Sequence, residues 1–466
     1  MMILGLYGIR IPERTLRDTF FSRALRLLYL LGLFFLPMQY AFSQDSSAVH
    51  RDTLSGFDAP LTLDSVIISG NEHTKDMVIL REMSLKPGMQ MTPEYLQYDQ
   101  ARIYSVGLFT QVEMRVNPTT PGKGNLEVHV RERWYIIPFP VFGIKEGDWH
   151  KAFYGAGLLH NNFRGRDEKL YVIGAVGYDP WGSISYRNPF LDDLGSYNYD
   201  GRLGYSRISN KSQQFAAYPN FDENHFAFSN TVGKRFNNYN IASLSAEYDV
   251  VGMSESVPNA TISSSGTDRF FVFGAGYTFD TRDLAEFPGS GVFTRTSITK
   301  YGLPGKELDN VRYALDIRGF VPLTEGFVSA SRFYTNVMAG SRSPSYNHVY
   351  FGYEYRIRGH YGQTTEGENI MGTSTEVRYA LFAPRYYKVD FLPEQFGVWR
   401  FAIALALFAD AGEAWFRGQP LAINSFEGGY GAGIDFLLPY SLVVRTEYAI
   451  NEVHRGQFIV DLGAAF

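Results

Sequence analysis

Apolar residues alternate with small or polar residues along the last stretch of the chain, residues 456–466. Phe458, Val460 and Leu462 share one side of this pattern, and Phe466 ends it. A period of two predicts a β-strand with one apolar face. Such a strand at a chain end suits hydrocarbon, where its backbone groups find partners only in a closed barrel. An edge strand of a soluble sandwich is the alternative interpretation.

Similar alternation recurs throughout residues 135–466, between turns rich in Gly, Asn, Asp and Pro. In one segment Leu442 and Tyr448 point one way, while Arg445 and Glu447 point the other way, into a wet lumen. We therefore predict an all-β transmembrane barrel of 16 antiparallel strands over residues 135–466. The expected strands are 136–144, 152–160, 168–178, 181–189, 196–208, 225–236, 239–251, 269–281, 292–301, 309–320, 325–338, 370–382, 399–410, 428–438, 440–450 and 456–466.

The N-terminus has the composition of a targeting segment. Several arginines precede an apolar run over residues 27–36, and Ala41 and Ser43 supply small residues after it. This arrangement predicts a secretory signal peptide over residues 1–43, cleaved after Ser43. An uncleaved anchor is the alternative, although the run is short for a spanning helix. We expect the polar residues 44–60 to form a flexible lead-in.

Residues 61–134 have the pattern of a small α+β module. A strand stops at Gly70 and Asn71, and a helical segment ends before Pro87. Thr92 followed by Pro93 provides a helix cap and a first-turn proline, which predicts a second helix. Two alternating segments follow, over residues 112–116 and 126–130. The predicted order is strand, helix, helix, strand, strand.

Composition and motifs exclude most enzymatic chemistry. The chain has no Cys, so it forms no disulfide or thiolate metal site. It contains no phosphate-binding loop, no nucleophile elbow and no histidine pair at metal-ligand spacing. Aromatic residues make up 16%, which suits the girdles of a membrane barrel, and the net charge of −5 gives no reason to expect nucleic-acid binding. We expect a protein that is not an enzyme, with no cofactor and no metal.

The first barrel strand contains Pro138 and Pro140. Both lack an N–H, and residues two apart direct their backbone groups toward the same neighbour. If that neighbour is the final strand, with Phe458, Gly463 and Phe466, the barrel closes on a weak lateral seam. Alternatively, the prolines only end the linker before pairing starts.

The module resembles a POTRA domain, the periplasmic repeat of outer-membrane assembly and secretion proteins. The residues that carry the resemblance are Val66-Ile67-Ile68-Ser69-Gly70-Asn71, Lys86-Pro87-Gly88 and Gly107-Leu108-Phe109. Only one copy fits before the barrel. The resemblance implies a free strand edge that accepts an extended client segment by strand addition, and a simple spacer is the alternative.

A second resemblance lies in the barrel. Ile357-Arg358-Gly359-His360, in a long connection between the eleventh and twelfth strands, is similar to the Val-Arg-Gly-Phe/Tyr loop signature of the bacterial surface antigen superfamily. The resemblance implies that the loop folds into the barrel and that Arg358 pairs with Glu376 and Asp410, which lie in strand motifs resembling those of the family. A solvated loop arginine is the alternative. His360 departs from the family's aromatic residue.

The family includes BamA/TamA-like assembly factors and two-partner secretion transporters. The resemblance, which a segment over residues 280–291 also supports, implies insertion of outer-membrane proteins or translocation of polypeptides across the outer membrane. It places the barrel in the outer membrane of a Gram-negative bacterium and the POTRA domain in the periplasm. The implied partners are outer-membrane lipids, unfolded or nascent polypeptides, and periplasmic chaperones or accessory proteins. A passive porin or a lipid-handling barrel is the alternative function.

Overall fold

The computed structural model describes residues 3–4, 61–145, 149–192, 195–218, 221–388, 398–422, 425–438 and 442–466. Apart from Ile3 and Leu4, the predicted signal peptide and lead-in lie outside these described residues. Ile3–Leu4 forms a two-residue strand, β1, which pairs with the last strand of the chain.

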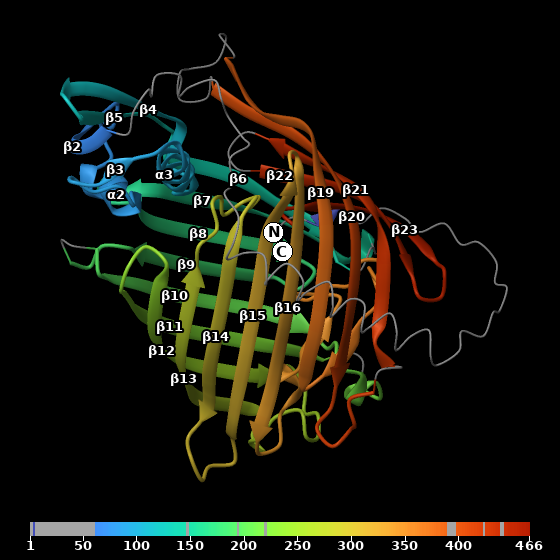
Figure 1. Cartoon of the computed structure of the whole chain (residues 1–466). Helices are drawn as coiled ribbons and strands as arrows, with labels where there is room; N and C mark the ends of the chain where they lie inside the picture. Colours follow the sequence, from blue (N-terminus) through green and yellow to red (C-terminus); the bar gives the residue numbers. More distant parts are fainter. Residues whose placement is uncertain are drawn as a thin grey trace.

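Sixteen antiparallel strands form the barrel, which confirms the predicted fold class (Figure 1). Consecutive barrel strands pair with one another, so the sheet follows the order of the chain. Strand β10 joins β9 to β11, and β1 adds a seventeenth member beside β23. The strands are β6 (Ile136–Ile144), β7 (Ala152–Phe163), β8 (Glu168–Gly177), β9 (Trp181–Asn188), β10 (Tyr197–Ser209), β11 (Asp222–Arg235), β12 (Asn240–Met253), β13 (Thr267–Asp280), β14 (Gly291–Gly302), β15 (Asp309–Thr324), β16 (Phe327–Gly340), β19 (Asn369–Lys388), β20 (Val398–Trp415), β21 (Glu427–Leu438), β22 (Leu442–Asn451) and β23 (Gly456–Leu462).

The two faces of the barrel differ in polarity. Large apolar side chains on alternate strand positions remain exposed on the outside, among them Leu244, Leu407 and Tyr448. Arg445 and Glu447, from the same strand as Tyr448, are buried inside. Such a continuous apolar outer surface is unfavourable in water and favourable in a bilayer, because each buried CH₂ contributes about 0.8 kcal/mol. No helix in the described part of the chain is long and apolar enough to cross a membrane.

The α+β module precedes the barrel. Its elements are β2 (Leu61–Ser69), α2 (Asp76–Glu82), β3 (Gln90–Met91), α3 (Pro93–Ser105), β4 (Phe109–Thr120) and β5 (Lys123–Glu132). The sheet has the order β3-β2-β5-β4, with β2 and β5 parallel. Short strand β3 was absent from the prediction, because two residues are too few for a periodic pattern. Helix α3 begins as predicted, with the Thr92 hydroxyl accepting from the Tyr95 N–H.

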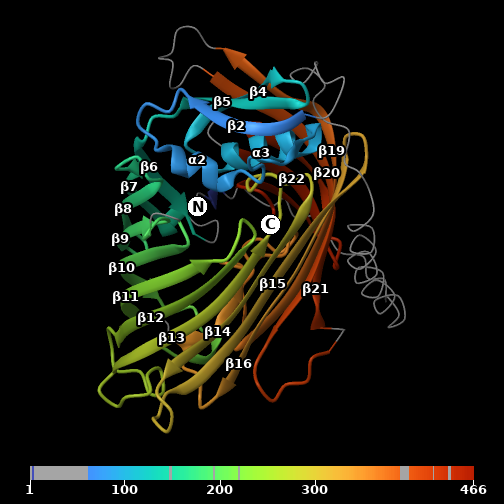
Figure 2. The ribbon, with the colours of Figure 1, turned by 60° about the vertical axis from the view of Figure 1, so that its left-hand side comes forward.

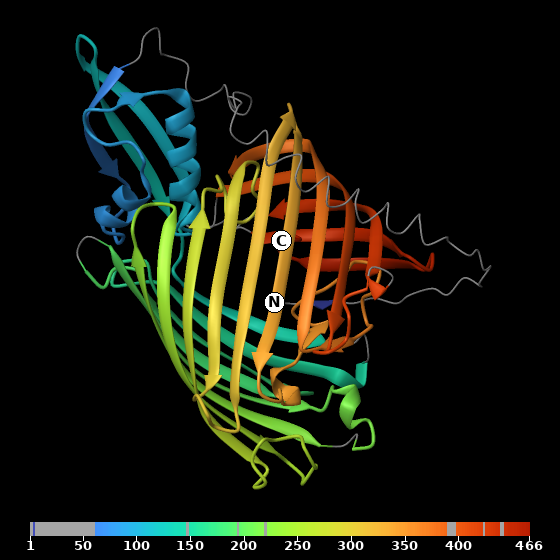
Figure 3. The ribbon, with the colours of Figure 1, turned by 60° about the horizontal axis from the view of Figure 1, so that its bottom comes forward.

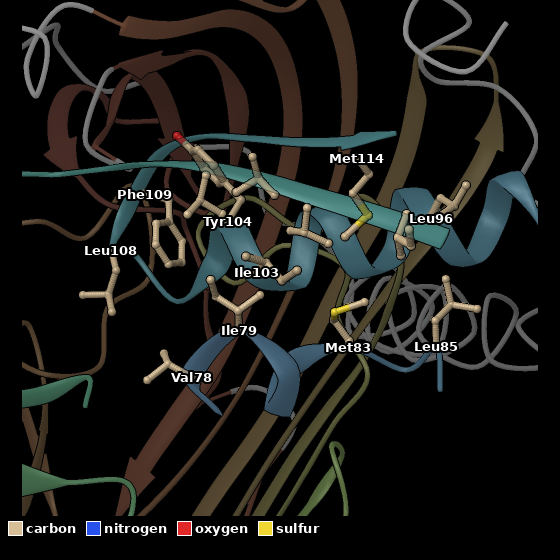
Figure 4. Close-up of a cluster of buried hydrophobic side chains, with 14 of the residues drawn as sticks. Val78, Ile79, Met83, Leu85, Leu96, Ile103, Tyr104, Leu108, Phe109 and Met114 are labelled. Atoms are coloured by element: carbon tan, nitrogen blue, oxygen red, sulfur yellow. The ribbon is translucent and has the colours of Figure 1, made fainter. Parts of the chain in front are cut away.

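The core of the module lies between the sheet and the two helices. Ile79 from α2, Ile103 from α3 and Phe109 from β4 are completely buried there (Figure 4). Two barrel side chains, Phe190 and Leu284, belong to the same buried cluster. The module and the barrel therefore share a hydrophobic core.

The module sits on the barrel turns at one end of the strands (Figures 2 and 3). At the contact, Glu82 of α2 accepts hydrogen bonds from Arg81, Arg102 and Arg235, the last residue of β11. Burial opposes ionisation of this carboxyl, but the three guanidinium groups outweigh it and lower the pKa of Glu82 to about 2. A cluster of three cations around one carboxylate fixes the orientation of the module on the barrel.

The end of the chain differs from the prediction. Strand β23 ends at Leu462, not at Phe466. Gly463 adopts a φ of +93°, which is accessible to glycine and turns the chain inward. The Phe466 ring is buried and stacks on Phe320 of β15 at 6.2 Å between centroids. The alternating pattern wrongly placed Phe466 on the lipid face, because a single positive φ breaks the two-residue period.

Candidate functional site

A long connection between β16 and β19, residues 341–368, fills part of the barrel interior. It contains a 3-10 turn (Ser345–Asn347) and a small hairpin formed by β17 (Val349–Phe351) and β18 (Thr365–Gly367). Ile357 and Phe351 pack with Tyr334 and Ile370 of the barrel wall in a buried cluster. These contacts hold the segment that carries Arg358 against the inside of the sheet.

Arg358 makes four side-chain hydrogen bonds to three carboxylates from three strands. Its Nε and Nη2 atoms donate to the two oxygens of Asp410 on β20, at 2.7 and 2.8 Å. Its Nη1 atom donates to Glu376 on β19 and to Glu447 on β22, both at 2.9 Å. These four side chains are between 1% and 5% exposed, so solvent screens their interaction very little. The Phe408 ring lies 3.6 Å from the guanidinium carbon and covers its face.

The ion pairs continue on both sides of Arg358. Glu376 also accepts from Arg378 Nε at 2.7 Å, and Glu447 accepts from Arg445 Nη1 at 2.8 Å. Arg445 donates in turn to Asp461 of the final strand at 3.0 Å. Charges therefore alternate in sign across β19, β20, β22 and β23, and the loop arginine connects strands that are not neighbours. A buried network of this kind tolerates its desolvation because each charge has a partner of opposite sign.

Glycines allow the loop backbone to approach the wall. A Cβ on Gly429 of β21 would lie 1.7 Å from the carbonyl oxygen of Arg358. A Cβ on Gly412 of β20 would lie 2.5 Å from the ring of Phe351. Gly359 itself has a φ of +98° and packs against Asn451. A side chain at Gly429 or Gly412 would push the loop inward and lengthen the bonds of Arg358.

A second polar cluster holds the base of the loop. Glu366 of β18 accepts from the Ser212 hydroxyl at 2.6 Å and from the Gln213 N–H at 2.8 Å, and it contacts His348 Nδ1 at 2.7 Å. Burial opposes ionisation of Glu366, but the bonds from His348 and Ser212 outweigh it and lower its pKa. This cluster connects the loop to the connection between β10 and β11, at the end of the barrel opposite the module.

His360, which departs from the family motif, has a polar role. It lies 2.8 Å from Glu452 through Nε2 and 2.9 Å from Gln363 through Nδ1. The hydroxyl of its neighbour Tyr361 donates to Asp461 at 2.8 Å. The imidazole therefore replaces aromatic packing with hydrogen bonds to the β22–β23 connection.

The structure brings Arg358, Gly359, Glu376 and Asp410 together, as the motif implied. Glu447 and Gly429 were missed as members of this site. Glu447 had been assigned to the lumen from its alternation on β22, but nothing in the sequence connects it to a loop 89 residues away. Close approach of two backbones gives no sequence signal beyond a glycine, and this chain has 46 of them.

The predicted seam residues have separate environments. Pro138 and Pro140 lie in β6, opposite Leu158 and Ala156 of β7. Phe458 is exposed on the outer face of β23. Gly463 and Phe466 lie beyond the strand, where the chain has turned inward.

The predicted residues of the module have structural roles. Gly70 has a φ of +82°, and a Cβ there would lie 2.0 Å from the Val130 carbonyl oxygen. The Asn71 side chain donates to the Thr74 carbonyl at 2.9 Å. Gly107 turns the chain after α3 with a φ of +80°, and Phe109 fills the core. Among the residues that the structure describes, no group of three His, Asp or Glu side chains is placed to bind a metal ion.

Together, the sixteen-stranded barrel, the docked α+β module and the arginine-anchored internal loop define an outer-membrane β-barrel of the POTRA-containing class. Residues 162–466 match the Omp85 superfamily domain, and residues 61–133 match the POTRA model described as a surface antigen variable number repeat. The chain belongs to the Omp85 superfamily.

Solved structures with a similar fold agree with this assignment. BamA from Haemophilus ducreyi lacking POTRA domains 1-3 is 16% identical, with a TM-score of 0.51 over 97% of this chain and 94% of that chain. CdiB from Escherichia coli is 11% identical, with a TM-score of 0.53 over 97% of this chain and 100% of that chain. CdiB from Acinetobacter baumannii is 12% identical, with a TM-score of 0.50 over 87% and 73% of the two chains.

Proposed function

We propose that this protein assists the insertion of outer-membrane proteins or the translocation of polypeptides across the outer membrane. Membership of the Omp85 superfamily and the similarity of its fold to BamA and CdiB support a polypeptide client. In this proposal the barrel spans the outer membrane and the POTRA domain faces the periplasm. Clients arrive unfolded, delivered by periplasmic chaperones or accessory proteins. Because the sequence has no nucleotide-binding loop, folding of the client supplies the free energy.

The observation that carries the proposal is an open strand edge on the POTRA domain. Strand β3 pairs only with Leu61 and Thr62 of β2, while the opposite edge of β2 is covered by β5. On the β3 side, the backbone of Leu63 is still hydrogen-bonded to Gly88 and Met89, and beyond Leu63 no strand in the described part of the chain pairs with this edge of β2. Ile67, in this open portion, is 48% exposed. An extended client segment gains backbone hydrogen bonds at such an edge and an apolar contact at Ile67.

The seam between the first and last barrel strands supports an exit route toward the membrane. The carbonyl of Tyr135 accepts from Asn161, and the N–H of Lys145 donates to Lys151, so odd-numbered residues of β6 bond toward β7. Alternate residues of a strand direct their backbone groups to opposite sides, so Pro138 and Pro140 face the other edge, toward β23. Two donors are missing from that edge, which weakens closure of the barrel there.

Depletion of the protein in its native host, followed by quantification of the outer-membrane proteome, tests the proposal. Loss of many barrel proteins would identify a general insertase, and loss of one or a few surface proteins a dedicated assembly or export factor. An unchanged proteome would contradict the proposal and favour the porin or lipid-handling alternative.

A photo-crosslinking residue at Ile67 tests the open edge directly. We expect it to capture an unfolded outer-membrane protein, while the same residue at Tyr95, which is 43% exposed on α3, serves as the control. Equal capture at both positions would refute binding at the edge.

Cysteine pairs test the proposed opening at the seam. Pairs placed between β6 and β23 in this naturally cysteine-free chain should cross-link and abolish activity. Full activity of the cross-linked protein would exclude lateral opening.

A further inference from the structure

The turn between β13 and β14, residues 281–290, forms a hydrogen-bonded strap. Asp283 Oδ1 accepts from the N–H groups of Leu284, Gly289 and Ser290, at 2.8, 3.0 and 3.2 Å. At its base, the Thr281 hydroxyl accepts from the Val292 N–H at 2.9 Å. The Asp283 carboxylate therefore joins the two sides of the strap, residue 284 and residues 289–290, through backbone hydrogen bonds.

One end of the strap is fixed to the POTRA domain. Leu284 is buried in the POTRA core, together with residues of α2 and α3. The next residue, Ala285, donates its N–H to the hydroxyl of Ser105, the last residue of α3, at 3.3 Å. The strap is therefore part of the interface between the POTRA domain and the barrel.

The tip of the strap reaches a distant part of the barrel wall. Phe287 packs against Ala402, Leu437 and Val443, which lie at the POTRA-side ends of β20, β21 and β22. The guanidinium carbon of Arg378, on β19, lies 4.4 Å from the centre of the Phe287 ring. In the sheet, β15, β16 and β19 separate β14 from β20. The strap consequently extends across the lumen from β13 and β14 to the β20–β22 wall and does not follow the intervening strand ends.

The C-terminal tail meets the strap at the same arginine. Arg378 lies 5.7 Å from the ring of Phe466 and 5.8 Å from that of Phe320. Its Nε donates to Glu376, but its two Nη atoms are buried without a hydrogen-bond partner within the described residues. Arg378 thus contacts the strap, the C-terminal tail and the ion-pair network of the loop.

Phe287, in the lumen, follows Leu284, in the POTRA core, by three positions in the chain. A fully extended chain spans at most about 3.6 Å per residue, so their Cα atoms are at most about 11 Å apart. While both side chains remain buried, the POTRA domain can move away from the barrel wall only until the Cα atoms of Leu284 and Phe287 reach this maximum distance. Any larger movement must withdraw Phe287 from the wall or Leu284 from the POTRA core.

We propose that the strap is a mechanical coupler, which closes the POTRA-side mouth of the lumen and opens it when the POTRA domain leaves the barrel turns. Docking of the domain inserts the Phe287 side chain of the strap against the β20–β22 wall, and undocking pulls it out. This coupling needs no client, so its test is independent of the function proposed above.

The test measures ion conductance of the purified full chain in planar bilayers. We expect Phe287→Ala to raise the fraction of time spent open on the order of tenfold or more, as expected for loss of a packed aromatic side chain. Leu284→Ala should raise it similarly, and the double variant should add little, because either change breaks the same coupler. Phe270→Ala is the matched control, since Phe270 is a buried aromatic residue near the opposite end of β13, in a cluster that contains no strap residue. An equal effect of Phe287→Ala and Phe270→Ala would overturn the proposal.

A disulfide cross-link provides a second experiment, whose outcome does not depend on the stability of an alanine variant. The pair Phe287→Cys with Val443→Cys introduces the only two cysteines of the chain. Oxidised, it should hold the conductance at the closed level and keep two labels, attached to non-canonical amino acids in the POTRA domain and the barrel, at one fixed distance. Reduction should restore opening and broaden that distance. An oxidised protein that opens, or whose POTRA domain moves as freely as in the reduced form, would also overturn the proposal.

Discussion

Replacing Arg358 by alanine should destabilise the folded barrel strongly. The substitution removes four side-chain hydrogen bonds and leaves Glu376, Asp410 and Glu447 buried near one another. Removing one partner of a buried ion pair typically costs about 3 to 5 kcal/mol, because the remaining charge is desolvated without compensation. A loss of this size changes the equilibrium constant for unfolding by two to nearly four powers of ten.

The three carboxylates do not suffer equally. Glu376 keeps Arg378, and Glu447 keeps Arg445. Asp410 has no second arginine partner among the described residues, so it carries most of the penalty. The double variant Arg358→Ala/Asp410→Asn should therefore recover part of the lost stability, because it removes the least compensated charge.

Denaturant titration of the protein refolded in lipid vesicles gives the free energy of unfolding, and the heat-dependent gel shift gives an independent midpoint. Arg356→Ala is the matched control, since Arg356 lies in the same loop but has a longer ion pair, 3.6 Å from Asp461. We expect a much smaller loss for this control. Equal losses for the two arginines, or no recovery in the double variant, would refute the role assigned to the Arg358 network.

Two further predictions follow from the geometry of the loop and of the POTRA contact. Gly429→Ala should lower the gel-shift midpoint, because the new Cβ would overlap the Arg358 carbonyl oxygen. Gly319→Ala, in open space on β15, is the control and should leave the midpoint unchanged. An equal midpoint for both variants would contradict the close approach of the loop backbone to Gly429. Glu82 has its pKa lowered from 4.5 to about 2, so its stabilising effect is complete above pH 4.5 and is lost as the pH falls from there toward 2, by about 3 kcal/mol in all. Spin-label distances between the POTRA domain and the barrel should broaden over that pH range in the wild type. Glu82→Gln should broaden them already at neutral pH, whereas the control Glu113→Gln, which alters an exposed ion pair, should not. A Glu82→Gln protein whose POTRA domain stays docked would contradict the role assigned to Glu82.

The sequence by itself determined the barrel, because the constraint behind it is local. In a strand between lipid and a wet lumen, apolar and polar side chains must alternate, as Leu442 and Tyr448 do with Arg445 and Glu447. The same pattern recurs in successive strands, so the barrel can be recognised from the sequence. The start of α3 at Thr92 and Pro93 was equally readable, since capping depends on neighbouring residues. The loop arginine and two of its acidic partners were found through motif resemblance rather than from periodicity.

Only the tertiary structure decided which distant residues meet. The third carboxylate at Arg358, the glycine beneath the loop, the inward turn of Phe466 and the strap from the POTRA core to the β20–β22 wall each join segments far apart in the chain. A two-residue period reports which face of a strand a side chain occupies, but it carries no information about what crosses the lumen to meet it. That choice depends on barrel closure and on backbone turns such as the one at Gly463, where a single positive φ redirects the end of the chain.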